Sequence, residues 1–343
     1  MKRVFAAVMA LCLLLSGCAV PRQTADTTKQ YTATFLTLFD TVTTIIGRAE
    51  SEDAFQKQAQ AIHDDLLYYH ELFDIYNEYD GVNNLKTVND NAGIAPVKVD
   101  SAIIALLKDC RDYYNLTGGK VNVAMGAVLR LWHNARTDGI NDPANAKLPD
   151  GEALEKAAEH CSFDSVIIDE AASTVYLSDP DASLDVGAVA KGWSAQRVAE
   201  SAPQGMLISV GGNVCATGPK LSDGTPWVIG IQDPDQPDKN LHTVFVKEGC
   251  VVTSGDYQRA YMVDGKRYHH IIDPETRMPS AWWRSVSVIG ADSGLGDALS
   301  TALFLMDREE GLALAQRCGV QVLWVDPAGE EYMTSGFEEI MRT

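Results

Sequence analysis

The chain has little positive charge. Its 343 residues include 28 Lys and Arg against 47 Asp and Glu, a formal net charge of −19. A protein that binds nucleic acid needs basic patches to contact phosphates, and the sequence contains no such patch. We therefore expect no nucleic-acid partner. The sequence also lacks a Rossmann glycine fingerprint and a P-loop, so neither of these nucleotide-binding motifs is supported.

Cysteines are few and widely spaced. The sequence has seven, with no C-x-x-C pair. Without Cys12 and Cys18, which lie near the N-terminus, an odd number remains: Cys110, Cys161, Cys215, Cys250 and Cys318. This pattern indicates neither a zinc site nor a disulfide framework. We interpret most of these cysteines as small buried hydrophobic residues.

No hydrophobic run is long enough for a typical membrane-spanning helix. The longest N-terminal run covers residues 4–15 and follows Lys2-Arg3, which is typical of an exported precursor. Leu15-Ser16-Gly17-Cys18 resembles a bacterial lipobox. We predict a signal peptide at residues 1–17, a lipidated Cys18, a flexible tether at 18–33 and one domain at 34–343. The protein would be extracytoplasmic and lipid-anchored to the bacterial cell membrane; the alternative is an ordinary signal peptide with a chance cysteine.

Helical and strand patterns are mixed without regular βαβ alternation. This favours an α+β fold, a single large domain of mixed, largely antiparallel sheets with packed helices. Residues 134–150 are polar and predict a loop. Asp100 is expected to cap the start of a helix at about 100–117. Other helices are expected at about 52–75, 151–160, 185–199, 296–306 and 309–317, and strands at 165–168, 175–177, 206–210, 227–231, 243–246, 285–289, 321–325 and 331–334.

Residues 251–279 concentrate polar side chains around a predicted hairpin. Asp264-Gly265 favours a tight two-residue turn between two β-type runs. His270 follows the second run and is a candidate general base, because an unperturbed imidazole titrates near neutral pH. Asp273 is close enough in sequence to orient its ring. The alternative is a purely structural histidine.

Two further patches suggest phosphate and metal chemistry. Asp297 and Thr301 are four residues apart on a predicted helix, so they share a face and could bind one magnesium ion. The alternative is an N-cap Asp and a Thr bonded to its own helix. The segment 185–192 places Lys191 at a helix start, where backbone amides would suit a pyrophosphate. Gly211-Gly212 permits either a tight turn or close approach of a flat ligand.

Together these patches resemble the ApbE-type flavin transferases, in the family's order along nearly the whole domain. The motifs are LFDT at 38–41, DIY at 74–76, TGGKVNVAMGAVLRLW at 117–132, DVGAVAKGW at 185–193, ISVGGN at 208–213, TSGDYQR at 253–259, YHHIIDP at 268–274 and DALSTALF at 297–304.

The resemblance implies a fold related to tunnelling-fold proteins and a magnesium-dependent FAD:protein FMN transferase. Such an enzyme attaches FMN from FAD to a Thr or Ser of a target protein, here expected to be an FMN-binding redox protein, and releases AMP. It implies a base at His270 and metal ligands at Ala188 (carbonyl), Asp297 and Thr301. It also implies FAD contacts at Phe39, Tyr76, Lys120, Val121, Asn122, Asp185, Lys191, Ile272 and Ser300.

Four positions depart from the family pattern. Asn122 and Ala124 stand where Asp and Thr are common, and Asp40 and Arg277 stand where Gly is usual. Arg277 therefore predicts a differently shaped turn after Pro274. Two alternatives remain open at this point: an FAD pyrophosphatase giving FMN and AMP, and a surface lipoprotein that binds flavin without turning it over.

Overall fold

The computed structural model describes residues 28–236 and 238–342. The predicted signal peptide, Cys18 and the first part of the tether lie outside these residues. The rest of the tether prediction is wrong, because residues 29–33 belong to strand β1 (Lys29–Phe35), which pairs with β2 (Thr43–Ala49). Tyr31 and Phe35 alternate toward the core, and Tyr31 stacks on Phe55 with ring centroids 5.6 Å apart. The domain therefore begins five residues earlier than expected from the sequence.

An eight-stranded antiparallel sheet organises the molecule, which confirms the predicted α+β class. Its strand order is β1-β2-β6-β7-β10-β13-β14-β15. After β1 and β2, its strands are β6 (Leu207–Val210), β7 (Asn213–Ala216), β10 (Gly249–Gly255), β13 (Ser285–Gly290), β14 (Gln321–Val325) and β15 (Glu331–Met333).

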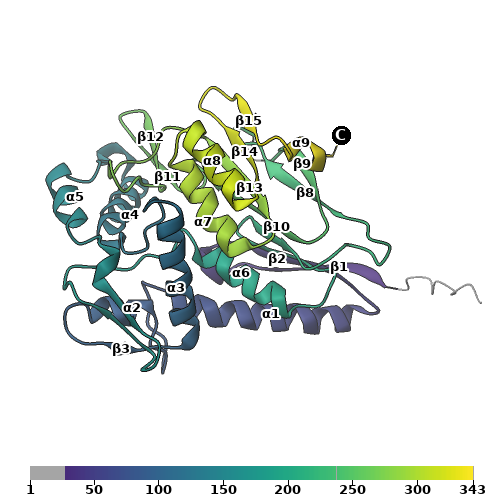
Figure 1. The fold of residues 1–343 in the computed structure, drawn as a ribbon, viewed down its shortest axis with the longest axis horizontal. Helices are drawn as coiled ribbons and strands as arrows, with labels where there is room; N and C mark the ends of the chain where they lie inside the picture. Colours follow the sequence, from purple (N-terminus) through teal and green to yellow (C-terminus); the bar gives the residue numbers. More distant parts are fainter. Residues whose placement is uncertain (1–27, 237, 343) are drawn as a thin grey trace, which may run out of the picture.

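Helices cover one face of this sheet and a hairpin covers the other (Figure 1). The helical layer consists of α1 (Glu52–Phe73), α6 (Ala190–Ser201), α7 (Ser293–Phe304) and α8 (Arg308–Cys318). The opposite face packs on β8 (Trp227–Gln232), β9 (Asn240–Val246) and α9 (Phe337–Ile340). Apolar side chains pack against both faces of the sheet. The sheet therefore supports α6 and α7 on one side. No helix of the described part of the chain is long and apolar enough to cross a membrane.

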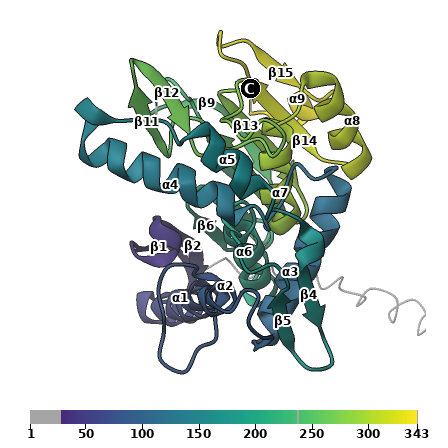
Figure 2. The ribbon, with the colours of Figure 1, turned by 90° about the vertical axis from the view of Figure 1, so that its left-hand side faces the viewer.

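The remaining elements lie beside the helical layer (Figure 2). One group consists of α2 (Leu85–Asp90), α3 (Ser101–Leu116), β3 (Val97–Lys98), β4 (Val166–Asp169) and β5 (Thr174–Leu177). Asp100 accepts a hydrogen bond from the Ala102 amide and caps α3, as predicted. On another side are α4 (Gly126–Asn141), α5 (Gly151–Ala158), β11 (Ala260–Val263) and β12 (Lys266–His269). Short 3-10 turns occur at Leu38–Asp40, Pro143–Asn145 and Phe163–Ser165.

The prediction of a loop at 134–150 is wrong for residues 134–141, because α4 continues to Asn141. From there to α5 the chain contains only the short 3-10 turn Pro143–Asn145. This helix is held by tertiary contact. A Cβ on Gly139 would lie 2.6 Å from the Tyr261 ring, so the helix passes very close to β11. The predicted hairpin is confirmed: β11 pairs with β12, and Asp264 and Gly265 take φ values of 49° and 77° in the turn. Such positive φ values are those of a type I′ turn.

Candidate active site

One cavity of about 610 Å³ opens where α4, α6, α7 and the segment after β12 meet. This volume is typical of a small-molecule site. Its walls include His270, Phe39, Tyr76, Lys120, Val121, Asn122, Asp185, Lys191, Ile272, Ala188, Asp297 and Thr301. These residues come from segments far apart in the sequence, and the fold brings them together.

Ser300 is the one predicted site residue that does not line this cavity. Its side chain is fully buried, and its hydroxyl donates to the Asp297 carbonyl at 2.9 Å. The Ser300 and Ser254 hydroxyls lie 2.8 Å apart, and Ser254 does line the cavity. Ser300 thus supports the wall from behind.

The closest approach in the site is between α6 and α7. A Cβ on Gly192 would lie 2.3 Å from the Ser293 carbonyl oxygen and 2.4 Å from Asp297 Cβ, so only glycine fits there. This approach lets the Gly192 amide donate to Asp297 Oδ2 at 2.8 Å. Gly192 is the third residue of α6, so its amide is one of those at a helix start that have no acceptor within the helix. Ala188 lies just before α6, and no amide of the described residues bonds its carbonyl.

Two more oxygens on the cavity wall have no hydrogen-bond partner. Within the described ranges no hydrogen bond involves Asp297 Oδ1 or the Thr301 hydroxyl, and both residues line the cavity together with Ala188. Asp297 is only 3% exposed, and its Oδ2 is fixed by Gly192 and by Lys191 Nζ at 3.5 Å. A carboxylate, a hydroxyl and a carbonyl are hard oxygen ligands, which suit magnesium with its remaining positions taken by water or phosphate. The residues therefore fit this ion.

The start of α6 provides the cavity with amides and charge. Lys191 is the second residue of α6 and lines the cavity. Asp185 lies just before it, and its Oδ1 accepts a hydrogen bond from the Gly187 amide at 2.9 Å. Burial raises the pKa of Asp185 above its ordinary value, while the Gly187 amide and the charge of nearby His133 oppose this shift. A positive helix start beside a lysine is an arrangement suited to phosphate groups.

His270 lies directly after β12 and is neutral at physiological pH. Burial, followed by the charge of Arg259, lowers the pKa of His270 to about 3. Its Nδ1 atom is buried without a hydrogen-bond partner among the described residues. Since the ring also lines the cavity, Nε2 is the nitrogen available to a ligand. A neutral imidazole can accept a proton there.

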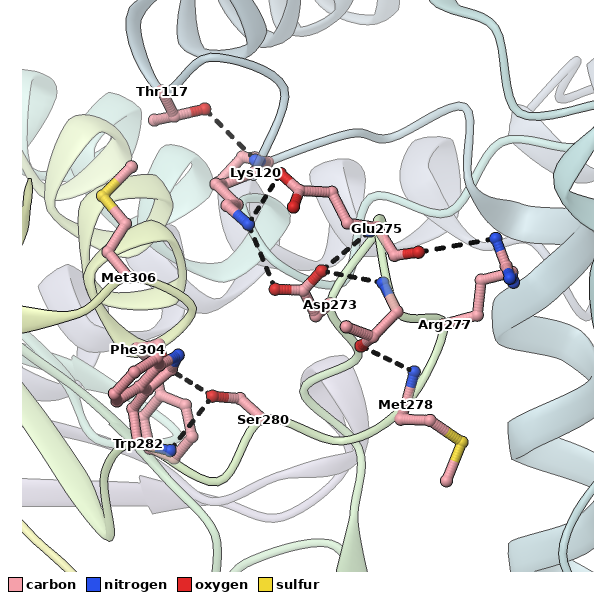
Figure 3. Close-up of polar contacts among 12 residues, drawn as sticks. Thr117, Lys120, Asp273, Glu275, Arg277, Met278, Ser280, Trp282, Phe304 and Met306 are labelled. Atoms are coloured by element: carbon pink, nitrogen blue, oxygen red, sulfur yellow. Dashed lines mark hydrogen bonds and ion pairs between the residues drawn. The ribbon is translucent and has the colours of Figure 1, made fainter.

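The expectation that Asp273 orients His270 is wrong (Figure 3). Asp273 Oδ2 accepts from Lys120 Nζ at 3.1 Å, while its Oδ1 accepts from the backbone amides of Glu275 and Thr276. Lys120 Nζ also lies 3.0 Å from Glu275 Oε1. Asp273 therefore fixes the turn after Pro274 and holds Lys120, which comes from a distant segment, against the cavity.

Two of the positions where the family has glycine take a left-handed backbone conformation here. Arg277 has a φ of 59° and Asp40 a φ of 52°. Trp132 Nε1 donates to the Arg277 carbonyl at 2.9 Å, which helps to hold this turn. The prediction that Arg277 gives the turn after Pro274 a different shape is thus not met, because Arg277 adopts the backbone conformation that favours glycine. The position stores strain instead. Asn122 donates to the Cys161 carbonyl at 2.8 Å and accepts from the Ala124 amide, so its amide group fixes its own segment.

Sequence reasoning missed two arginines. Arg136 lies on α4, in the segment predicted as a loop, and Arg259 is exposed just before β11; both line the cavity. Within the described ranges neither forms an ion pair with a carboxylate. Arg136 donates to His133 Nδ1 at 3.2 Å, and His133 stacks on Tyr76 with centroids 5.1 Å apart. Burial and the charge of Arg259 lower the pKa of Arg136, so the two guanidinium groups act on each other. Their unpaired charge makes this part of the cavity attractive to anions.

A model of the ApbE family matches residues 37–324. The chain belongs to the ApbE family. A relative from Treponema pallidum (strain Nichols), named FAD:protein FMN transferase, is 35% identical over 277 residues, which is 75% of each chain. A second with the same name, from Klebsiella pneumoniae (strain 342), is 34% identical over 245 residues, 69% of this chain and 73% of that protein. The resemblance identified from the motifs is confirmed.

Solved ApbE structures share the fold described above. The ApbE protein of Thermotoga maritima superposes with a TM-score of 0.81 at 29% identity, covering 92% of this chain and all of that one. The flavin transferase ApbE of Vibrio cholerae gives a TM-score of 0.74 at 23% identity, covering 91% and 99%. Its identity is low, so this second likeness concerns the fold alone. The family's curated members are transferase enzymes.

Proposed function

We propose that this chain is a magnesium-dependent FAD:protein FMN transferase acting on an extracytoplasmic acceptor protein. The observation that carries the proposal is a set of three oxygens without hydrogen-bond partners among the described residues: the Ala188 carbonyl, Asp297 Oδ1 and the Thr301 hydroxyl. The Gly192 amide fixes the other Asp297 oxygen at 2.8 Å. All three residues line the cavity, so their oxygens can serve as ligands of a cation there. The names of the relatives support the same activity.

In the proposed reaction, FAD lies in the cavity with its pyrophosphate at the start of α6. Magnesium held by Ala188, Asp297 and Thr301 would neutralise charge on the pyrophosphate when bound. Lys191 contributes a fixed positive charge at the same helix start. Asp185 and the segment 120–122, which line the cavity, would contact other parts of FAD. These residues position the substrate, which is most of what phosphoryl transfer requires of a protein.

His270 would accept the proton of the acceptor hydroxyl. A Thr or Ser hydroxyl of the acceptor attacks the phosphorus of the FMN half, and the bond to the AMP oxygen breaks as the new phosphoester forms. The hydroxyl proton passes to His270 Nε2, and AMP leaves with the bonding electron pair. Because burial and nearby cations keep the ring neutral, its lone pair is available at physiological pH. A positioned base of this kind contributes about 10²–10⁴-fold to the rate.

We also propose that the protein is attached to the membrane through lipid on Cys18. The support is the lipobox-like sequence together with the basic N-terminus and the short apolar run. The acceptor would then be a protein of the same compartment.

The proposed activity is tested by following both products. The full chain is incubated with FAD and an FMN-binding acceptor protein that carries a candidate Thr, with magnesium or with excess chelator. We expect the acceptor to gain the mass of FMN and AMP to appear in equal amount, only with magnesium. Release of free FMN and AMP at the same rate with and without acceptor would instead establish an FAD pyrophosphatase. Unchanged FAD would point to a flavin-binding protein without turnover.

A further inference from the structure

Two cysteines face each other across neighbouring strands of the large sheet. Cys215 lies in β7 and Cys250 in β10, and the register pairs them directly. Both are buried, with exposed fractions of 2% and 0%, and both belong to the apolar cluster beneath α6. Because residues directly opposite in an antiparallel pair project to the same face, the two side chains lie side by side.

The hydrogen bonds along β6 and β7 show whether the peptide groups of Cys215 point toward β10 or away from it. Gly211 and Gly212 form a two-residue turn closed by Val210 and Asn213, so hydrogen-bonded pairs alternate from there along β6 and β7. The Thr217 amide donates to the Met206 carbonyl at 2.9 Å, which agrees with this alternation. By this alternation Cys215 and Ile208 of β6 form a hydrogen-bonded pair. The peptide groups of Cys215 therefore point toward β6 and away from β10.

The pairing of β10 with β13 shows in which direction the peptide groups of Cys250 point. The Asp256 amide donates to the Arg284 carbonyl at 2.9 Å, and alternation from there along β10 and β13 makes Cys250 and Gly290 a hydrogen-bonded pair. The peptide groups of Cys250 therefore also point away from β7. Cys215 and Cys250 form a non-hydrogen-bonded pair, the closely spaced kind, with Cα atoms about 4.5 Å apart.

This spacing lies within the range that a disulfide can bridge, at its short end. Among the described residues, the other three cysteines lie outside strands and have no cross-strand partner. Cys110 lies in α3, Cys161 follows α5, and Cys318 ends α8. Only the register of the sheet reveals the pair, since the two residues are far apart in the sequence.

We infer that Cys215 and Cys250 form a cross-strand disulfide when the chain folds in the presence of an oxidising disulfide. The two thiols lose two protons and two electrons as the sulfur–sulfur bond forms. The oxidant, a small-molecule or protein disulfide, takes them up and becomes two thiols. Burial raises the pKa of the Cys215 thiol to about 12, so the folded pair reacts slowly and the bond forms while the strands are still open.

The proposed disulfide would lie next to α7, the helix that carries Asp297. Cys250 Sγ lies 3.3 Å from the point where a Cβ on Gly296 would stand, and Gly296 directly precedes Asp297 on α7. A disulfide here would close the chain around β8 and β9 and stiffen the two strands beneath the first turns of α7. We therefore expect oxidation to raise resistance to unfolding. This inference does not depend on the proposed transferase activity.

The test uses the full chain, refolded from urea in a buffer of oxidised and reduced glutathione. Remaining thiols are alkylated in denaturant, and the protein is digested with trypsin without reduction. Cleavage after Arg197, Lys220, Lys247 and Arg259 places Cys215 and Cys250 on separate peptides. We expect one cross-linked species with the summed peptide mass less two hydrogens, lost on treatment with dithiothreitol. Alkylated or singly glutathionylated peptides alone would overturn the inference.

A second measurement compares urea midpoints of oxidised and reduced protein. The wild type should show a higher midpoint when oxidised, and Cys215→Ala should show no difference between the two states. Cys110→Ala, which removes an equally buried thiol from α3, is the matched control and should keep the difference. If Cys215→Ala kept the redox-dependent shift, the stabilising bond would not be this one. None of these readouts involves FAD.

Discussion

The close approach of α6 and α7 can be tested by replacing Gly192 with alanine. The new Cβ would stand 2.3 Å from the Ser293 carbonyl oxygen and 2.4 Å from Asp297 Cβ. Both obstacles are backbone or backbone-attached atoms, so the helices themselves must separate, by about 1 Å, to restore ordinary contact. Overpacking of this kind costs about 1–3 kcal/mol. Loss of the hydrogen bond from Gly192 to the Asp297 carboxylate costs about 1.5–3 kcal/mol more.

Alanine also favours a helix over glycine by about 1 kcal/mol, so the net loss should be about 1.5–5 kcal/mol. Urea unfolding measures this as a midpoint lowered by about 1 M. Gly151→Ala is the matched control, because that glycine begins α5 and its added Cβ would meet nothing within 4 Å. If the two variants unfolded at the same midpoint, the tight contact between α6 and α7 would not exist.

Four further predictions concern the site. Arg277→Gly should raise the free energy of unfolding by up to about 1 kcal/mol, because it relieves a φ of 59°, whereas glycine at the neighbouring Thr276 should lower it; urea unfolding measures both. Asp297→Asn should raise the magnesium concentration required for half-maximal transfer, since it removes the one charged ligand, while FAD binding measured by fluorescence persists. The transfer rate at low FAD should not fall as pH drops from 8 to 6, because His270 has a pKa of about 3; an unperturbed histidine would lose about three quarters of its neutral form at pH 6. Arg259→Gln should raise this pKa, as followed by NMR of the ring, since it removes the charge that lowers the pKa most.

The low pKa of His270 also affects stability. The unfolded chain has an ordinary histidine pKa near 6.5, whereas the folded value is about 3. Between these values the unfolded state binds more protons, so this residue contributes stability above about pH 6.5 that is lost as the pH falls toward 3.

Local patterns in the sequence predicted much of the fold. The Asp264-Gly265 turn, the Asp100 cap and the shared face of Asp297 and Thr301 each depend on residues close together in the chain, and the structure contains all three. The α+β class followed from the order of such elements. What failed depends on tertiary contact: α4 carries many polar residues, and its second half is held by the approach of Gly139 to Tyr261.

The sequence predicted most residues of the site, but it did not predict all of the contacts between them. Motif positions identified most of the cavity wall, because each motif keeps its residue types. The direction in which a side chain points depends on tertiary contacts. Asp273 is near His270 in sequence, yet its carboxylate bonds to Lys120, 153 positions away. Arg136 was missed because the helix that carries it was read as a loop, and the Cys215–Cys250 pair because only sheet register places the two residues together.

In the proposed reaction, His270 takes the proton from the acceptor hydroxyl, and the cavity binds FAD without the help of this residue. The most direct test measures the intact mass of the acceptor after reaction with FAD and magnesium, using the wild type and His270→Ala side by side. FAD affinity is measured for both proteins by flavin fluorescence. We expect equal affinities within a few-fold, an FMN adduct with the wild type and a rate lower by about 10²–10⁴-fold with the variant. Full transfer by His270→Ala would rule out His270 as the base.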